Sequence, residues 1–577
     1  MDYTEISVDT GAEAFIELLN INKVGCIFLN PGTDTIAIQE ALAKFKATGR
    51  RTPQVILCPH ETVAMAAAHG YFAATGRPQV VLVHVDVGTQ NIGGALHNAQ
   101  RGRIGVVVCA GKSPSSFAGE RLGSRSGGMM WWQDQRDQAG IVRNFMKWDY
   151  ELRFNENAHH VVQRAFQIAS AEPCGPVYLT LPGEVLAEKI KSVRALDTAK
   201  YSAPVTPQAD LDMLNKAAGI LTAAKEPLII TGYSGRNAGA VASLVELAET
   251  IGARVASSGQ YMSFPSTHSL RILGFGAGEH LSRADAVLII DHDIPYMPAM
   301  TRLKPDIEVI QIDIDPVKEN MPMWGFPVDI MLHADSAKAI PLLTQKIRER
   351  ITPEQKGRSH SRLEELREQR KRLEIEWTDS ALALSRRSPI SADWLCYCIG
   401  ELIDEDTLVV DEALTSGGSL SRYIKRTKPG TLFNSGGSSL GFGLGASLGV
   451  KLAAPDKMVV CLVADGSFLF GCPTPAFWVS HVYHLPFLCI VVNNQGYNAV
   501  RMLLRNTFGK DNFAEKEPLF SGLDITPSPD YAMIARACQA YGEVVEDPAE
   551  VKPALGRALE QVKAGRSALL DVRISGS

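Results

Sequence analysis

The chain carries the stretch Val459-Val460-Cys461-Leu462-Val463-Ala464-Asp465-Gly466-Ser467-Phe468, and further on Ile490-Val491-Val492-Asn493-Asn494-Gln495-Gly496-Tyr497. Each segment opens with an apolar, β-branched run and closes on a polar turn. Such runs predict buried strands of a parallel sheet. Because open α/β sheets bind ligands at the carboxyl ends of their strands, we expect both turns to face one crevice.

The two turns offer hard oxygen ligands. The Asp465 carboxylate, the Asn494 side-chain oxygen and the Gly496 carbonyl suit Mg2+ or Ca2+ shared with a phosphate. Gly466 lets the backbone approach an anion, and a helix N-terminus at Ser467 favours negative charge. These residues predict a site for a metal and a phosphate. The alternative is that both are ordinary turns at the ends of strands.

Composition excludes several classes of protein. The 577 residues are 45% apolar and 21% charged, which is typical of a globular chain of about three to four domains. A net charge of −5 without a basic block argues against nucleic-acid binding. No apolar run approaches the ~20 residues that span a bilayer. The acidic N-terminus lacks an apolar signal segment, and the ten scattered cysteines suggest free thiols, so we expect a cytoplasmic protein.

Strands alternate with helical stretches along the whole chain. This pattern predicts an α/β fold of three doubly wound parallel-sheet domains, at 1–187, 205–346 and 385–577. We expect a linker near 186–207 and a solvated connecting helix at 347–377. The predicted strands include 24–29, 54–58, 80–85, 105–110, 228–230, 286–290, 309–312 and 568–572.

The middle domain contains only a weak sequence signal for nucleotide binding. Gly232 and Gly235 lack the G-x-G-x-x-G spacing of dinucleotide-binding folds. We therefore expect a colourless protein without bound flavin.

The opening pair of turns resembles the thiamine diphosphate motif, which begins with Gly-Asp-Gly and ends with Asn-Asn. Ala464 replaces the first glycine, but Asp465 and Asn494 keep the metal-binding groups. Pro59-His60-Glu61, the run 66–71 and Thr75-Gly76-Arg77-Pro78 look like the pyrimidine-binding domain of the thiamine diphosphate decarboxylase and acetolactate synthase superfamily. The resemblance covers nearly the whole chain and implies pyrimidine-binding, central and diphosphate-binding domains in that order.

Glu61 follows a predicted buried strand and precedes an Ala-rich helix. From its position alone, the residue could be a carboxylate that the helix dipole favours. The resemblance instead implies that Glu61 lies against the aminopyrimidine ring of thiamine diphosphate. There it would promote the imino tautomer of the ring, which removes the C2 proton of the cofactor. A buried carboxylate suits this role because burial raises its affinity for a proton. In that family the Glu and the metal motif meet across a subunit interface. The resemblance therefore implies a homodimer or a homotetramer.

Three further segments look most like benzoylformate decarboxylase. Asn30-Pro31-Gly32-Thr33 is similar to its Asn-Pro-Gly-Ser turn, which implies that the Thr33 hydroxyl contacts the substrate carboxylate. His84 lies at the position of its catalytic histidine. In Gly436-Gly437-Ser438-Ser439-Leu440-Gly441-Phe442, Leu440 would be the apolar wedge that bends the cofactor, and the Ser438 carbonyl would accept from its 4′-amino group.

Other candidates are less specific. His84 suits proton transfer near neutral pH, although a strand-end histidine can be purely structural. Gln133, or Gln135 in an alternative register, resembles a residue at the edge of the active site. Thr415 and Ser416 end a strand where the family binds diphosphate. His60 and His292 could reach the site, whereas His69 is expected to pack within its helix.

Together these features predict a thiamine diphosphate- and Mg2+-dependent enzyme. It would decarboxylate a small-molecule 2-oxo acid through an ylid and an enamine, and release an aldehyde or ligate a second carbonyl compound. An acetolactate synthase-like transferase and a 2-hydroxyacyl lyase use the same steps. The alternative of another class is a non-catalytic interaction protein with the same fold. No nucleic acid or membrane is expected as a partner.

Overall fold

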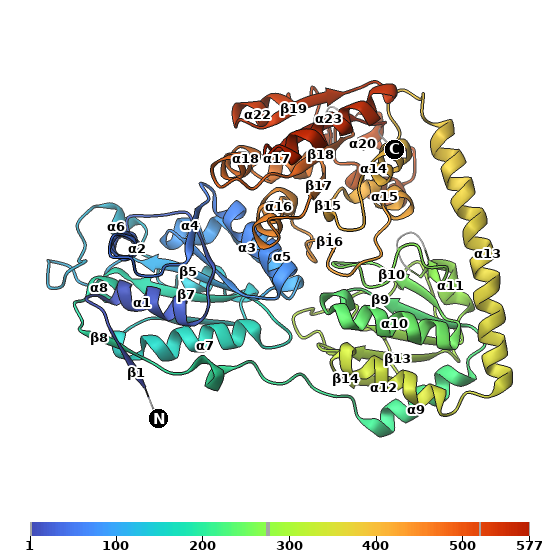
Figure 1. Ribbon diagram of the computed structural model, residues 1–577, viewed down its shortest axis with the longest axis horizontal. Helices are drawn as coiled ribbons and strands as arrows, with labels where there is room; N and C mark the ends of the chain where they lie inside the picture. The colour runs from blue at the N-terminus through green and yellow to red at the C-terminus, as the bar shows by residue number, and fades with distance from the viewer. Residues whose placement is uncertain (1–2, 273–276, 518–520, 576–577) are drawn as a thin grey trace.

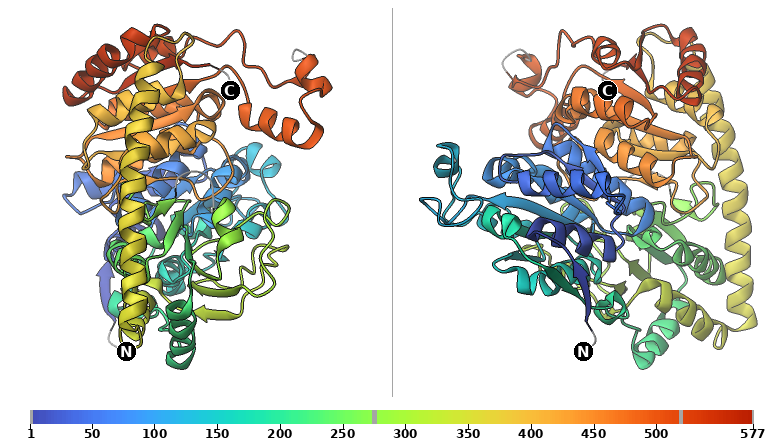
Figure 2. Two further views of the ribbon diagram at one scale, coloured as in Figure 1. Left: turned by 90° about the vertical axis from the view of Figure 1, so that its right-hand side faces the viewer. Right: turned by 60° about the vertical axis from the view of Figure 1, so that its left-hand side comes forward.

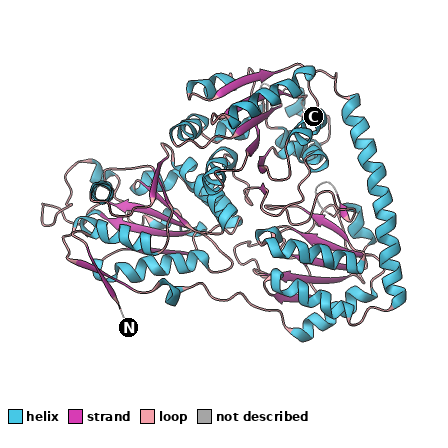
Figure 3. Cartoon of the chain, in the orientation of Figure 1, coloured by secondary structure: helices cyan, strands magenta, loops and turns pink. Residues whose placement is uncertain are grey.

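The computed structural model describes residues 3–272, 277–517 and 521–575. Three six-stranded sheets, each with every described strand pairing parallel, follow one another along the chain. Helices cover the sheets, as the colours of Figure 3 show. The predicted α/β class with three parallel-sheet domains is confirmed. No described helix has the length and apolar content needed to cross a membrane.

The N-terminal sheet has the strand order β3-β2-β4-β5-β7-β6. Its strands are β2 (Cys26–Leu29), β3 (Gln54–Leu57), β4 (Gln79–Val83), β5 (Val106–Lys112), β6 (Trp148–Glu151) and β7 (Val177–Pro182). Its main helices are α1 (Gly11–Ile21), α2 (Ile36–Ala47), α3 (Glu61–Thr75), α4 (Val85–Asn91), α5 (Gly93–Arg101) and α7 (Ala158–Ser170). The chain goes from β2 to β3 on one side and then to β4 on the other. A topological switch point, where such sheets bind ligands, therefore lies between β2 and β4.

The central sheet has the order β11-β10-β9-β12-β13-β14. Its strands are β9 (Pro227–Thr231), β10 (Arg254–Ser257), β11 (Arg271–Ile272), β12 (Ala286–Ile290), β13 (Glu308–Asp313) and β14 (Ile330–His333), and its helices are α9 (Leu211–Ala223), α10 (Ala238–Ile251), α11 (Gly278–Arg283) and α12 (Ser336–Arg348). By the same reasoning its switch point lies between β9 and β12.

The C-terminal sheet has the order β16-β15-β17-β18-β20-β19, with its switch point between β15 and β17. Its strands are β15 (Leu408–Glu412), β16 (Leu432–Phe433), β17 (Val459–Ala464), β18 (Leu488–Asn493), β19 (Tyr541–Val545) and β20 (Ala568–Arg573). Its helices include α14 (Ala392–Leu402), α15 (Gly417–Tyr423), α16 (Phe442–Ala453), α17 (Asp465–Phe470), α18 (Pro473–Val482), α19 (Asn498–Phe508), α20 (Phe513–Lys516), α22 (Tyr531–Ala537) and α23 (Val551–Lys563).

Two connections join the three units. The predicted solvated helix is α13 (Pro353–Ala383), which runs along one edge of the molecule from the central to the C-terminal unit (Figure 1). Its start is a capping box in which Thr352 and Gln355 exchange side chain-to-backbone hydrogen bonds. The segment 186–207 is not simply a linker, because β8 (Ser192–Ala195) within it pairs antiparallel with β1 (Thr4–Ser7). The exact domain boundaries remain a prediction.

The N-terminal and C-terminal units pack directly through α3 and α16. Glycines allow this close approach: a Cβ on Gly70 would lie 2.2 Å from the Ala446 carbonyl oxygen, and one on Gly449 would lie 1.9 Å from that of Ala67. A shared apolar core continues from one unit into the other. The contact places the first turn of α3, with Glu61, close to the segments that surround α16.

Candidate active site

The predicted metal ligands come together at the switch point of the C-terminal sheet. Asp465 is the first residue of α17 and is fully buried, and its Oδ2 accepts from the Gly496 N–H at 2.9 Å. Asn494 follows β18, and its Nδ2 donates to the Thr415 hydroxyl at 3.5 Å. The Gly496 carbonyl accepts one bond, from the Asn498 N–H. Residues from three neighbouring segments thus converge on one point.

Two oxygen atoms at this point lack hydrogen-bond partners among the residues that the structure describes. Asp465 Oδ1 and Asn494 Oδ1 are both buried and unpaired. Burial raises the pKa of the Asp465 carboxyl, while nearby backbone N–H groups lower it. Unpaired buried oxygens are costly, and a cation that both oxygens bind removes that cost. Among the described residues no group of three or more His, Cys, Asp or Glu side chains could bind a metal, so a cation here would need further oxygens from a ligand.

Hydroxyl and backbone groups surround the same point. Thr415 and Ser416 lie in a short 3-10 turn after β15, and Ser416 is buried. Gly466 and Ser467 belong to the first turn of α17. A Cβ on Gly466 would lie 2.8 Å from the Tyr497 ring, so only glycine fits there. All four residues therefore lie where the sequence predicts a diphosphate site.

The turn that contains Ser438 and Leu440 precedes α16. Its two serines, Ser438 and Ser439, are held by the N-terminal unit. Asn98 Nδ2 donates to the Ser439 carbonyl at 2.9 Å, and Asn98 Oδ1 accepts from the Ser439 N–H at 3.0 Å. His97 Nε2 accepts from the Ser438 N–H at 3.1 Å. Asn98 therefore occupies the Ser439 carbonyl, and the role predicted for the Ser438 carbonyl stays a prediction.

Glu61 is the first residue of α3 and is 6% exposed. Its carboxylate oxygens accept from Asn30 Nδ2 at 2.8 Å and Asn91 Nδ2 at 3.1 Å. Cys472 lies just after α17. Burial raises the pKa of its thiol, and the negative charge of Glu61 is a second, smaller cause. The two asparagines were not among the predicted site residues, although Asn30 begins the Asn-Pro-Gly-Thr turn that the sequence singles out.

His84 lies after β4, beside Glu61. Its Nδ1 binds the Asp34 carboxylate, and this hydrogen bond raises the pKa of the imidazole against the opposing effect of burial. The Gln133 side chain also hydrogen-bonds to His84 and raises its pKa. A Cβ on Gly32 would lie 1.9 Å from His84 Nδ1, so glycine is needed there for the ring to fit. Asp34 was not among the residues predicted for the site.

Other candidates are placed less centrally. Thr33 is exposed on the turn after β2, and Gln135 donates to Asp86 at 2.9 Å. His60 caps α3, where its Nδ1 accepts from the Thr62 N–H at 3.2 Å. His69 is buried edge-on against Phe442, as the sequence suggested, and burial lowers its pKa to about 3. His292 lies within the central unit, where its Nε2 is 3.1 Å from the Ser258 hydroxyl oxygen.

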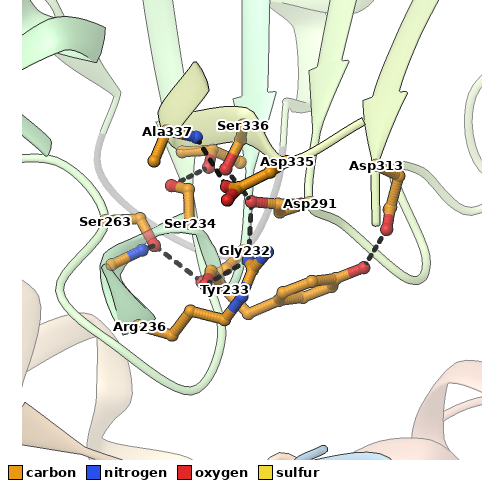
Figure 4. A network of polar contacts seen from close by, with 12 residues as sticks. Gly232, Tyr233, Ser234, Arg236, Ser263, Asp291, Asp313, Asp335, Ser336 and Ala337 are labelled. Carbon is orange, nitrogen blue, oxygen red and sulfur yellow. Dashed lines mark hydrogen bonds and ion pairs between the residues drawn. The ribbon is translucent and has the colours of Figure 1, made fainter. Parts of the chain in front are cut away.

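The switch point of the central sheet is filled by its own side chains (Figure 4). Arg236 Nη1 donates to Asp291 Oδ2 at 2.7 Å, and the Ser336 hydroxyl donates to the same oxygen. The Tyr233 hydroxyl donates to Asp313, whose other oxygen accepts from the fully buried Lys318 at 2.7 Å. These groups lie where an open α/β sheet binds nucleotides.

We therefore expect the purified protein to be colourless. An absorbance spectrum from 300 to 550 nm checks this, since bound flavin absorbs there. A stoichiometric yellow flavin would show that our interpretation of the central unit is wrong, and would favour an acetolactate synthase-like activity.

Comparisons with known proteins agree with this arrangement. Three sequence models match in order: the N-terminal thiamine pyrophosphate binding domain of thiamine pyrophosphate enzymes at 9–141, their central domain at 214–343 and their C-terminal thiamine pyrophosphate binding domain at 415–572. The acetolactate synthase isozyme 3 large subunit of Escherichia coli is 26% identical over 98% of this chain and 95% of its own. A benzoylformate decarboxylase of Pseudomonas aeruginosa is 26% identical over 97% and 98%.

Solved structures show the same fold. A 4-hydroxybenzoylformate decarboxylase from Rhodococcus jostii aligns with a TM-score of 0.78 at 22% identity, over 98% of this chain and 99% of the other. The benzoylformate decarboxylase from Polynucleobacter necessarius aligns with a TM-score of 0.79 at 20% identity, over 99% of each chain. The three domain matches together cover more than half of the chain and establish that it belongs to the thiamine pyrophosphate enzymes.

Proposed function

We propose that the chain is a thiamine diphosphate- and Mg2+-dependent decarboxylase or carboligase that acts on a 2-oxo acid. The observation that carries the proposal is the adjacency of Glu61 and His84. A Cβ on Gly88 would lie 3.1 Å from Glu61 Oε1 and 3.5 Å from His84 Cβ, so the Glu61 carboxylate and the base of the His84 side chain both lie beside Gly88. A carboxylate and an imidazole with a raised pKa, side by side, suit proton transfer to and from a reacting carbon and oxygen.

The cofactor would be bound at both ends by named residues. Asp465, Asn494 and the Gly496 carbonyl would hold Mg2+ together with diphosphate oxygens, because Asp465 Oδ1 and Asn494 Oδ1 are buried without partners. Thr415, Ser416, Gly466 and Ser467 would bind the diphosphate. When bound, thiamine diphosphate supplies a carbon nucleophile for the substrate carbonyl. Glu61 would hold the proton at the pyrimidine ring.

His84 and its neighbours would serve the substrate. The Asp34 carboxylate orients the imidazole and raises its pKa, so His84 can carry a proton near neutral pH. Gln133 and the exposed Thr33 hydroxyl would contact the substrate carboxylate or the product. This set of residues favours protonation and release of an aldehyde.

A second candidate is an acetolactate synthase-like transferase. It is supported by the equal identity, 26%, to an acetolactate synthase and to a benzoylformate decarboxylase. A panel of 2-oxo acids, each with and without an acceptor aldehyde or a second 2-oxo acid, separates the two activities. Carbon dioxide with aldehyde indicates a decarboxylase, and carbon dioxide with a 2-hydroxy ketone indicates a transferase. No carbon dioxide from any substrate would contradict both.

A homodimer or homotetramer in which a second copy completes the site is part of this proposal. Large apolar side chains are exposed beside both groups of site residues: Ile36, Val87 and Trp132 in the N-terminal unit, and Leu414 and Phe470 in the C-terminal unit. Helices α19 and α20 also stand away from the body of the molecule (Figure 2) and expose Leu503, Phe508 and Phe513. A second copy that covers such surfaces would remove apolar area from water.

Mixing two inactive variants tests this assembly. If each site takes Glu61 from one chain and Asp465 from the other, Glu61→Gln and Asp465→Ala chains that are unfolded and refolded together should regain about a quarter of wild-type activity. Each variant refolded alone is the control and should stay inactive. Mixed dimers without activity would show that both residues of a site belong to one chain.

A further inference from the structure

We propose that Glu412 is a positioning residue that fixes the turn from Ser438 to Gly443, and with it the wedge Leu440, in the geometry that the cofactor needs. The inference rests on the proposed function and adds to it a residue that neither the sequence motifs nor the comparisons assign. Glu412 is the last residue of β15 and is 7% exposed.

The carboxylate of Glu412 binds three successive backbone N–H groups. Its Oε1 accepts from Gly441 at 2.7 Å and from Phe442 at 3.2 Å, and its Oε2 accepts from Gly443 at 2.6 Å. These N–H groups belong to the start of α16, where no intrahelical acceptor exists for them. A negative charge at this end of the helix is also favoured by the helix dipole.

The turn is held at both ends, and Leu440 lies between them. On one side Asn98 holds both the N–H and the carbonyl of Ser439. On the other side Gly441, with φ of +91°, is held by Glu412 and packs against α17, since a Cβ there would lie 2.9 Å from Phe470. The first residue of α17 is Asp465, so Glu412 links the position of the wedge to the element that carries the metal ligand.

Global stability does not explain this carboxylate. Burial raises the pKa of Glu412 to about 7, although the three N–H donors lower it. A raised pKa in the folded state means that the contribution of this group to stability is present below its unfolded pKa and is lost as the pH rises through about 7. The charged form therefore costs stability at neutral pH, and its benefit is the local order of the turn.

Glu412→Gln tests the inference in two steps. The amide oxygen can accept from two of the three N–H groups, while the NH2 group faces the third donor. In protein without cofactor, hydrogen exchange at residues 441–443 should accelerate by about 10- to 100-fold, as expected for lost hydrogen bonds to a charged group. In protein loaded with Mg2+ and thiamine diphosphate, exchange of the C2 proton per bound cofactor should slow by about tenfold or more. Retention of Mg2+ and inorganic diphosphate, which depends on Asp465 and Asn494, should not change.

Asp411→Asn is the matched control. Asp411 lies one residue earlier on β15, and burial raises its pKa to about 6. It accepts from the Ala413 N–H at 2.9 Å and lines a cavity toward the central unit, on the other side of the strand. This variant should change neither the exchange of the 441–443 amides nor that of the C2 proton. If Glu412→Gln does not fold, Asn98→Leu releases the other end of the turn and should slow C2 exchange in the same way.

The possible failures are distinguishable. Faster amide exchange with an unchanged C2 exchange rate would mean that Glu412 is only a helix cap, and would overturn the inference while the proposed function stands. Unchanged amide exchange would overturn it as well. Wild-type protein that binds no thiamine diphosphate would overturn the proposed function and this inference together.

Discussion

Replacing Glu61 with Gln is expected to slow exchange of the C2 proton of bound thiamine diphosphate with solvent deuterium by about 10²–10⁴-fold, the usual contribution of a positioned acid–base group. The variant keeps the shape of the side chain and removes its ionisable carboxylate. Asn30 and Asn91 can still hold the new amide after one of them rotates its own amide group. NMR of quenched samples follows the exchange without knowledge of the substrate. Because the C-terminal unit supplies the proposed diphosphate and metal ligands, cofactor binding should weaken only moderately.

Glu13→Gln is the matched control for this experiment. Glu13 is also buried in the first turn of a helix of the N-terminal unit, where it pairs with Lys44 at 2.7 Å. This variant should lose stability and leave C2 exchange unchanged. A purely structural Glu61 would contribute only about 0.3–1 kcal/mol through the helix dipole, and Glu61→Gln would then shift only the melting temperature. If Glu61→Gln folds, binds the cofactor and leaves the rate of C2 exchange unchanged, Glu61 has no part in the mechanism. The roles inferred for His84 and Thr33 would then be withdrawn as well. This outcome would favour a non-catalytic interaction protein.

The fold could be predicted because its strands are buried on both faces. Parallel strands between two layers of helices are continuous apolar runs, and β12 begins and ends at the predicted residues. Apolar runs do not show where a strand turns into a helix. The predicted strand 80–85 ends at Val83, and α4 begins at Val85, whose N–H donates to Asp34. That contact joins residues far apart in the sequence, so no local pattern reveals it.

The same limit applies to the site. Asp465, Asn494 and Glu61 could be proposed as site residues because each directly follows a predicted strand or its turn, and strand ends face the crevice of such sheets. Their partners depend on tertiary structure: His84 binds Asp34 from 50 residues away, and Ser439 binds Asn98 from 341 residues away. Glu412 stands shortly before the candidates Thr415 and Ser416, but only the fold shows that its carboxylate binds the N–H groups at the start of α16. The available signal was a polar residue directly after a predicted strand or its turn, as at Glu61 and Asp465.

Replacing Asp465 with Ala should abolish Mg2+-dependent retention of thiamine diphosphate, because this carboxylate is the one charged group among the three proposed metal ligands. The same substitution should not destabilise the protein when it is free of cofactor. Burial raises the pKa of Asp465, so its contribution to stability is present below its unfolded pKa and is lost as the pH rises through the folded value. At pH 8 the charged side chain, with Oδ1 unpaired, costs stability that the alanine variant does not. The cofactor-free variant should therefore melt at the wild-type temperature or above it.

Thermal melts at pH 8, with and without Mg2+ and thiamine diphosphate, measure both effects. A ligand at 100 times its Kd stabilises the protein that binds it by about 2.7 kcal/mol, and Asp465→Ala should show none of this gain. Asp291→Ala is the control, since Asp291 is equally buried after β12, also has an unpaired Oδ1, and pairs with Arg236. That variant should be less stable and still gain stability from the ligands. A ligand-dependent loss in Asp465→Ala and not in Asp291→Ala could not come from a merely structural role of a buried carboxylate. Full stabilisation of Asp465→Ala by Mg2+ and thiamine diphosphate would instead show that the metal lies elsewhere.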